Sequence, residues 1–371
     1  MKSYKVSYIH ELPNWPKLTW DQERLASRLA AVHLRQGRLL GRMEALGFKL
    51  REEAVLQTLT IDVLKSSEIE GEFLNPEQVR SSVARHLGID VGKKIHVDRH
   101  VEGTVDMMLD ATQNFEAPLT SERLFGWHAA LFPTGHSGLH KIIVGQWRDD
   151  SKGRMQVVSG PISKEKVHFI APKSNKLKSE MSAFIKWANK KNDVDPILRS
   201  ALLHFWFVTI HPFDDGNGRI ARAIADWALA QSENSSQRFY SMSSQIRLER
   251  ETYYDILEKT QKGSLDITDW MIWFLECLER ALSGTEVTLA DVFRKTKFWE
   301  KYVNKKFNDR QRLVLNKLLD GFEGKLTSSK WAKLAKCSQD TSQRDIQSLI
   351  EQKILKKDEA GGRSTSYSLV D

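Results

Sequence analysis

Residues 211–222 read HPFDDGNGRIAR, and this short segment combines several distinct chemistries. His211 is a candidate proton acceptor, and Asp215 offers the hard oxygen ligands that Mg²⁺ prefers. Gly216 and Gly218 leave backbone N–H groups open to an anion, because glycine has no side chain to cover them. The segment therefore predicts a polyphosphate site with a base beside it.

The flanking sequence places this segment at the start of a helix. An apolar, aromatic run at 201–210 leads into the segment, and residues 220–230 have a helical pattern. Phosphate binds well at a helix N-terminus, because unpaired N–H groups and the positive end of the helix dipole face the ligand. Arg219 and Arg222 are spaced i, i+3, so they are expected to project from one face of that helix.

The segment resembles the signature of the Fic-domain adenylyltransferases, H-P-F-x-[D/E]-G-N-G-R-x-x-R, with every defined position filled. The resemblance implies a mainly α fold with a Fic-type helical core, and transfer of AMP from ATP to a Ser, Thr or Tyr hydroxyl of a target protein or of the chain itself. It implies that His211 is the catalytic base and that Asp215 holds Mg²⁺. The nucleotide phosphates are expected on Gly216, Asn217, Gly218, Arg219 and Arg222. Gly218 stands where the phosphate-transferring Doc relatives carry Lys, which favours AMP transfer over kinase chemistry.

A second pattern lies at the end of a helix predicted over about 51–70. Residues 66–71, SSEIEG, fit the family's inhibitory pattern [S/T]-x-x-x-E-[G/N], with Ser66 and Glu70 at i, i+4 and Gly71 ending the helix. The resemblance implies that Glu70 pairs with Arg222 and so occupies the guanidinium that the γ-phosphate of ATP needs. ATP then binds in a pose that is wrong for in-line attack.

Between 135 and 172 the helical period gives way to short runs that favour strands. Residues 155–160 and 167–170 predict two strands joined by a turn that contains Pro161. From the residues alone, an ordinary surface hairpin is an equally good interpretation. The resemblance implies a flap that binds the target protein by adding its backbone as an extra strand. The nucleotide is then expected beside Val157, Val158, Ser159 and Gly160.

A helix predicted at 249–262 carries Tyr253, Tyr254 and Leu257 on one apolar face. Such an aromatic stripe is typical of core packing. Fic proteins, however, line the adenine pocket with a Tyr-Tyr-x-x-Leu element, which is followed four residues later by a polar side chain, usually Asn. This chain has Gln261 there, and Tyr254 and Gln261 are the expected nucleotide contacts.

The composition fits a chain of several domains without a membrane segment. Its 371 residues exceed the usual size of a single domain. The two cysteines, Cys277 and Cys337, form no CxxC pattern, which indicates neither a disulfide framework nor a zinc site and fits a cytoplasmic location. No stretch reaches the roughly 18 apolar residues that span a bilayer, so no membrane partner is expected. Neither a Walker A loop nor a Rossmann fingerprint is present, which excludes the commonest other nucleotide sites.

The excess positive charge is concentrated at the C-terminal end of the chain. Residues 293–371 contain 18 Lys and Arg against 10 Asp and Glu, which accounts for the whole net charge of +8. After a basic linker at 293–308, three helices and a hairpin with a Gly361-Gly362 turn predict a winged helix. Its third helix presents Gln339, Ser342, Gln343, Arg344 and Gln347. Duplex DNA is the expected partner, and a protein contact remains an alternative.

We therefore expect three domains: an N-terminal helical region with the inhibitory helix at 1–95, the Fic catalytic core at 96–292, and the basic winged-helix-like domain at 293–371. Two other functions remain open. The chain could be a DNA-binding regulator that responds to ATP, or the same site could remove AMP from a protein, with Glu70 positioning a water. The sequence also leaves open whether the chain forms a homodimer.

Overall fold

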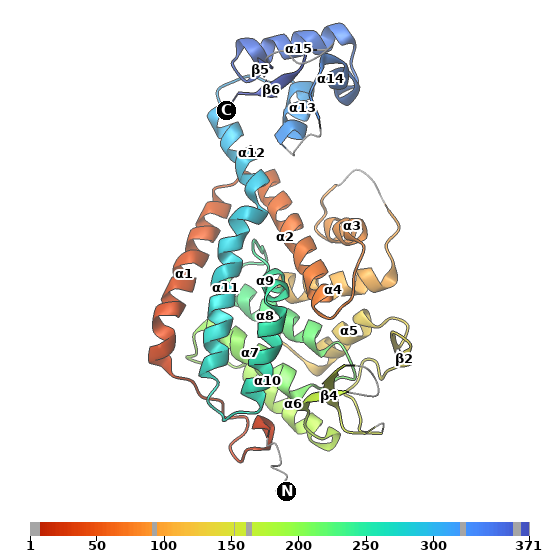
Figure 1. Ribbon diagram of the computed structural model, residues 1–371, viewed down its shortest axis with the longest axis vertical. Helices are drawn as coiled ribbons and strands as arrows, with labels where there is room; N and C mark the ends of the chain where they lie inside the picture. The colour runs from red at the N-terminus through yellow and green to blue at the C-terminus, as the bar shows by residue number, and fades with distance from the viewer. Residues whose placement is uncertain are drawn as a thin grey trace. The chain divides into compact units, whose positions relative to one another are not determined.

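The computed structural model describes residues 8–90, 95–151, 153–160, 165–319, 324–358 and 365–370. These residues form α-helices and three two-stranded antiparallel pairs, which confirms the predicted mainly α fold (Figure 1). None of the described helices is both long and apolar enough to cross a membrane. The chain divides into two compact units, Met1–Val287 and Thr288–Asp371, and each is described by itself.

Three helices form the N-terminal region: α1 (Gln22–Glu44), α2 (Phe48–Ile69) and α3 (Pro76–His86). The start of α3 follows the local code, because the Asn75 side chain accepts hydrogen bonds from two first-turn amides and Pro76 occupies the first helical position. Glu70 is the C-cap of α2, and Gly71 follows with φ +83°, a conformation that glycine adopts without strain. The segment predicted to be inhibitory thus forms a sharp turn between α2 and α3.

The core of the first unit is built around α7 (Pro196–Ile210) and α8 (Asn217–Glu233), which pack closely against each other. Nearly every residue of α7 is buried, as expected for a helix that is apolar on all sides. Three further helices that contact this pair are α4 (Arg99–Gln113), α5 (Ser121–Leu131) and α6 (Ser174–Asn189), whereas α9 (Met242–Leu248) packs against α2. The end of α7 and the start of α8 are thereby held in a rigid frame.

Two further helices and the flap complete the first unit. The helices are α10 (Arg250–Gln261) and α11 (Thr268–Thr288), and Trp270 of α11 donates a hydrogen bond to the Ala201 carbonyl of α7 at 2.9 Å. Strands β3 (Gln156–Ser159) and β4 (Lys166–Ile170) form an antiparallel hairpin whose register shifts between Val157 and Val158. A smaller pair, β1 (His136–Ser137) and β2 (His140–Lys141), precedes it. The predicted turn at Pro161 lies outside the described residues.

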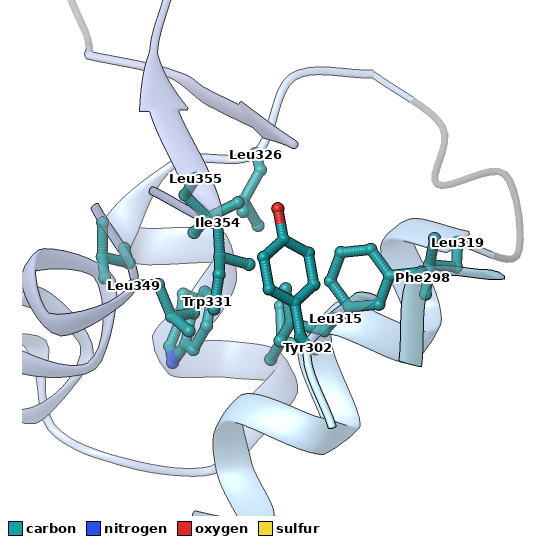
Figure 2. Close-up of a cluster of buried hydrophobic side chains, with 11 residues drawn as sticks. Phe298, Tyr302, Leu315, Leu319, Leu326, Trp331, Leu349, Ile354 and Leu355 are labelled. Atoms are coloured by element: carbon teal, nitrogen blue, oxygen red, sulfur yellow. The ribbon is translucent and has the colours of Figure 1, made fainter. Parts of the chain in front are cut away.

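The second unit contains helices α12 (Ala290–Lys301), α13 (Asp309–Leu319), α14 (Ser328–Ala335) and α15 (Gln339–Glu351), followed by strands β5 (Leu355–Lys357) and β6 (Tyr367–Leu369). The strands pair with each other, and Leu326 between α13 and α14 bridges to Tyr367. Figure 2 shows its core, in which Trp331 of α14 packs among Leu349, Ile354 and Leu355. The predicted Gly361-Gly362 turn lies outside the described residues.

The predicted linker at 293–308 is wrong for most of its length. Helix α12 runs through it, and Phe298 and Tyr302 pack into the core of the second unit (Figure 2). Their i, i+4 spacing places both aromatic rings on one helix face, while Lys297 and Lys301 are exposed. The many basic residues of this segment suggested a linker, but the segment forms an amphipathic helix.

Candidate active site

The motif loop joins α7 to α8 and is fixed from one side by Arg148. His211 caps α7 in the left-handed conformation, with φ 51°, a conformation that is strained for a residue with a side chain. The buried Arg148 guanidinium donates from Nε to the His211 carbonyl at 2.8 Å and from Nη2 to the Pro172 carbonyl at 2.6 Å. The Arg148 amide donates to the Pro212 carbonyl at 2.9 Å. These bonds hold His211 in its strained position.

His211 is arranged as a proton acceptor. Its Nδ1 lies 3.1 Å from the Val208 carbonyl oxygen, to which Nδ1–H donates, so the neutral ring keeps the Nε2 lone pair free. Burial lowers the pKa of His211 to about 4, against the opposing effect of the Val208 hydrogen bond. The imidazole is therefore neutral at pH 7 and able to accept a proton.

A second histidine, His128 of α5, orders the middle of the loop. Its ring stacks on Phe213 with centroids 4.2 Å apart, and its Nδ1 accepts the Gly145 amide at 3.1 Å. The remaining Nε2–H donates to the Asp215 carbonyl at 3.2 Å. Burial lowers the pKa of His128 to about 4, so this tautomer persists at neutral pH. Sequence reasoning missed His128, because it stands far from the motif in a helix that carries no signature.

The two acidic residues of the motif, Asp214 and Asp215, make different contacts. Asp214 Oδ2 accepts the Ile143 amide at 2.9 Å, which ties the loop to the approach to the flap. Asp215 accepts the amide of Gly216 at 2.6 Å and the hydroxyl of Ser137, and it lines the cavity beside the motif. A carboxylate at the wall of a polar cavity fits a magnesium ion, which prefers hard oxygen ligands and retains several waters.

A cavity of about 730 Å³ opens against the motif, within the usual range of small-ligand sites. Helix α8 begins there with Gly216 as its N-cap, in the left-handed conformation and without a side-chain capping bond. Most of the residues predicted to form the site line this cavity: Glu70, Val157, Val158, Ser159, His211, Asp215, Gly216, Asn217, Gly218, Tyr254 and Gln261. The other five predicted site residues are not among its lining residues: Ser66, Gly71, Gly160, Arg219 and Arg222.

Glu70 lies on the first turn of α8. Its Oε1 is 2.8 Å from Arg222 Nη2, and Arg222 also donates to the hydroxyl and the carbonyl of Ser66 at 3.0 and 2.8 Å. A Cβ added to Gly218 would come within 2.1 Å of Glu70 Oε1, so the carboxylate fills the space that glycine leaves open. The structure thus brings together Ser66, Glu70 and Arg222, with the carboxylate at the helix N-terminus where an anion is favoured.

Arg219, which the sequence predicts to contact the phosphates, pairs with an acidic residue and is not among the residues that line the cavity. Its Nη1 is 2.5 Å from Glu72 Oε2, and its guanidinium covers the Phe132 ring at 5.0 Å. The other Glu72 oxygen lies 2.8 Å from His100 Nε2. Burial raises the pKa of Glu72, but the hydrogen bond from His100 and the charge of Arg219 outweigh burial and lower it overall. Arg219 therefore fastens the turn after Glu70 to α8, a contact that the sequence did not reveal.

The aromatic residues of α10 divide between core and cavity. Tyr253 is buried and its hydroxyl lies 2.9 Å from His204 Nε2, whereas the Tyr254 hydroxyl donates to Glu70 Oε2 at 3.3 Å. Burial and the Glu70 charge raise the pKa of Tyr254 to about 12, so the hydroxyl keeps its proton. Gln261 donates to the Thr209 hydroxyl at 3.3 Å. Arg250, which sequence reasoning missed, lines the cavity and donates to the Ile69 carbonyl at 2.7 Å.

Known proteins resemble this chain in two regions. Residues 118–229 match the Fic/DOC family, and residues 8–89 match a family described as a domain of unknown function, DUF4172. The chain is 27% identical over 240 residues to a protein adenylyltransferase Fic of Culex quinquefasciatus, and 26% identical over 272 residues to that of Drosophila melanogaster. These matches cover 63% and 71% of this chain but only 42% and 48% of those relatives.

Two solved structures resemble the fold. A Fic family protein from Desulfovibrio desulfuricans matches 95% of this chain and 97% of its own length, with a TM-score of 0.57 at 19% identity. A Fic domain containing signaling protein from Bacteroides thetaiotaomicron matches 70% of this chain and 98% of its own length, with a TM-score of 0.52 at 20% identity. The motif and the match over residues 118–229 agree, so this segment is a Fic domain of the Fic/DOC family, and the two solved structures share the fold of the chain.

Proposed function

We propose that this chain is a protein adenylyltransferase that transfers AMP from ATP to a Ser, Thr or Tyr hydroxyl of a target protein. The observation that carries the proposal is that a neutral His211 lines the same cavity as Asp215 and the first turn of α8. A base, a hard anionic ligand and a helix N-terminus are the parts that nucleotidyl transfer needs in one place. The relatives named protein adenylyltransferase support this choice among phosphate chemistries.

In the proposed reaction the α8 amides of Asn217 and Gly218 bind the phosphates of ATP. Asp215 would hold Mg²⁺, which would supply positive charge to neutralise the phosphates. His211 Nε2 takes the proton of the target hydroxyl, whose oxygen forms a bond to the α-phosphorus. The bond from that phosphorus toward the β-phosphate breaks, and pyrophosphate leaves. A general base of this kind contributes about 10²–10⁴-fold to the rate.

We further propose that Glu70 inhibits this reaction. Its carboxylate lies against Gly218 and Arg222, the groups that the terminal phosphate of ATP would otherwise contact. Arg222 is almost fully buried, so an anion that pairs with it is screened little by water. Catalysis then requires the turn that carries Glu70 to withdraw from the first turn of α8.

The flap offers a docking edge for the target. Strands β3 and β4 pair with each other, and within the described residues neither has a second neighbour. Val158 and Val167 expose 42% and 39% of their surface, and Val158 lines the cavity. A target backbone added to this hairpin would be held by main-chain hydrogen bonds, so many target sequences could be accepted.

The test is incorporation of label from ATP with Mg²⁺, using full-length protein and a mixture of cellular proteins as acceptors. Label from the α-phosphate, and none from the γ-phosphate, is expected on protein. Label from the γ-phosphate alone would establish kinase chemistry and overturn the proposal. Loss of bound AMP from a previously labelled protein, with no net transfer under any condition, would favour the reverse reaction instead.

A second proposed function belongs to the second unit, which we propose binds duplex DNA. Three helices followed by a strand pair is the order of a winged helix, and Gln343, Arg344 and Gln347 are exposed on one face of α15. Lys333 and Lys336 of α14 are exposed as well. Ser342, expected to face DNA, is buried and donates to the Gln339 carbonyl, so it is removed from the predicted contact surface. Binding of the full-length chain to duplex DNA that weakens with salt is the expected result.

A further inference from the structure

A serine, a histidine and a glutamate form one hydrogen-bonded row on the wall of the cavity. Ser159 Oγ of β3 lies 2.6 Å from His168 Nε2 of β4, and His168 Nδ1 lies 2.5 Å from Glu258 Oε2 of α10. All three residues line the cavity that also contains His211 and the first turn of α8. Sequence reasoning named Ser159 only as a neighbour of the nucleotide and did not consider the other two.

The charges in this row set the direction of its hydrogen bonds. Burial raises the pKa of Glu258, but hydrogen bonds from Lys262 and His168 outweigh burial and lower it overall, so Glu258 is ionised at neutral pH. An ionised carboxylate can only accept, so His168 donates to it from Nδ1. In the neutral imidazole, Nε2 then carries the lone pair and accepts the hydroxyl hydrogen of Ser159. A carboxylate, an imidazole and a hydroxyl in this order make an activated nucleophile.

We propose that Ser159 is an AMP acceptor within this chain, activated by His168 and Glu258. The inference rests on the adenylyl transfer proposed above, because that reaction supplies ATP and the phosphate site. Ser159 Oγ forms a bond to the α-phosphorus of ATP, and its proton moves to His168 Nε2. The bond from that phosphorus toward the β-phosphate breaks, and pyrophosphate leaves with both electrons of that bond. The positive charge on His168 is stabilised by Glu258.

The location of Ser159 explains why this hydroxyl is favoured over others on the surface. Serine hydroxyls in solvent have neither a fixed base nor a nucleotide beside them, whereas Ser159 has a base at 2.6 Å and shares a cavity with the phosphate site. Placing a nucleophile and its reaction partner in one site removes much of the entropic cost of their meeting. Self-modification is therefore expected to concentrate at this position.

The test uses the full-length chain with Glu70→Gly, incubated with Mg²⁺ and ATP labelled at the α-phosphate, followed by peptide mass spectrometry. AMP is expected on the peptide that contains Ser159. Ser159→Ala removes it, and Ser159→Thr, which restores a hydroxyl, regains it at position 159. Ser151→Ala is the matched control, because that exposed serine bonds to the Asp149 carboxylate instead of an imidazole, and its loss should leave the label in place.

Two conservative variants test whether the row of Ser159, His168 and Glu258 transfers the proton. His168→Gln can still hydrogen-bond but cannot take the proton, so the initial rate of label on Ser159 is expected to fall by about 10²–10⁴-fold. Glu258→Gln keeps the shape and removes the charge, and a smaller fall is expected. Unchanged rates in both variants would show that the row only ties the flap to α10, and would overturn the proposal.

The remaining outcomes separate this inference from the function on which it rests. AMP at other positions, or on added cellular proteins alone, overturns the assignment of Ser159 and leaves adenylyl transfer standing. An absence of α-label from both the chain and the added proteins overturns adenylyl transfer and this inference together.

Discussion

Replacing Glu70 by Gly removes the carboxylate that lies on the first turn of α8. The change deletes the 2.8 Å contact with Arg222 Nη2 and the 3.3 Å hydrogen bond from the Tyr254 hydroxyl. It also empties the space against Gly218, where the carboxylate now lies. Arg222 keeps its two bonds to Ser66, so the guanidinium stays in place and becomes available to an incoming phosphate.

The size of the effect follows from the contacts that are lost. A hydrogen bond between charged groups stabilises by about 1.5–3 kcal/mol. An anion at a helix N-terminus adds about 0.3–1 kcal/mol. The closed arrangement is therefore favoured by about 2–4 kcal/mol, and because 1.4 kcal/mol corresponds to a tenfold change, Glu70→Gly should raise the rate of AMP incorporation by about 30- to 10³-fold.

The assay is the initial rate of α-label incorporation at saturating ATP, compared between the wild type and three variants. Glu70→Gln keeps the size and loses the charge, so an intermediate rate is expected. Glu68→Gln is the matched control, because Glu68 lies on the same helix but contacts Lys65 at 2.7 Å and Arg247 at 3.5 Å instead of the motif. A rate in Glu70→Gly equal to the wild type, or an equal rise in Glu68→Gln, would refute the inhibitory role.

Three further results are expected. His211→Ala should abolish transfer to a target protein, because the imidazole is the proposed base. ATP binding, measured by calorimetry, should persist, because the imidazole is not a phosphate ligand. Retained transfer would show that His211 is not the base. Burial lowers the pKa of His211 to about 4, so the rate of AMP transfer should stay constant as the pH falls from 8 to about 5 and decline only near 4. An inflection near pH 6.5, the ordinary pKa of histidine, would contradict this effect of burial. Arg344→Ala in the full-length chain should weaken binding to duplex DNA and reduce the slope of log affinity against log salt by about 1, and an unchanged slope would argue that α15 faces another partner.

The parts of the fold that could be predicted from the sequence are those determined by residues close together along the chain. Asn75 and Pro76 predict the start of α3, because the capping side chain of Asn75 and the fixed φ of Pro76 act within one helical turn. The apolar run before His211 predicts a buried helix, because a helix that is apolar on all sides is stable only where every side is covered. Helix α12 was missed although Phe298 and Tyr302 carry the spacing, because the dense lysines around them suggested a linker.

The parts of the site that were missed depend on contacts between distant segments. His128 reaches Asp215 and Phe213 only because α5 packs beside the motif, and no residue spacing along the chain records that contact. Arg219 was expected on the phosphates because of its place in the motif, yet Glu72 lies near enough to pair with it. Motif positions reveal which residue types are required, whereas the partner of a charged side chain is decided by the tertiary fold.

The first turn of α8 attracts phosphate and carboxylate for the same physical reason, so the proposed activity and the proposed inhibition would compete for one anion site. The carboxylate of Glu70 is tethered, and its effective concentration at that site is set by how firmly the end of α2 is docked. Among the contacts that hold that end besides Glu70 itself are the bond from Arg250 to the Ile69 carbonyl at 2.7 Å and the pair between Arg219 and Glu72 at 2.5 Å. The proposed inhibition therefore depends on these contacts as well as on the carboxylate. A partner that loosens either contact would release the site without ever entering it.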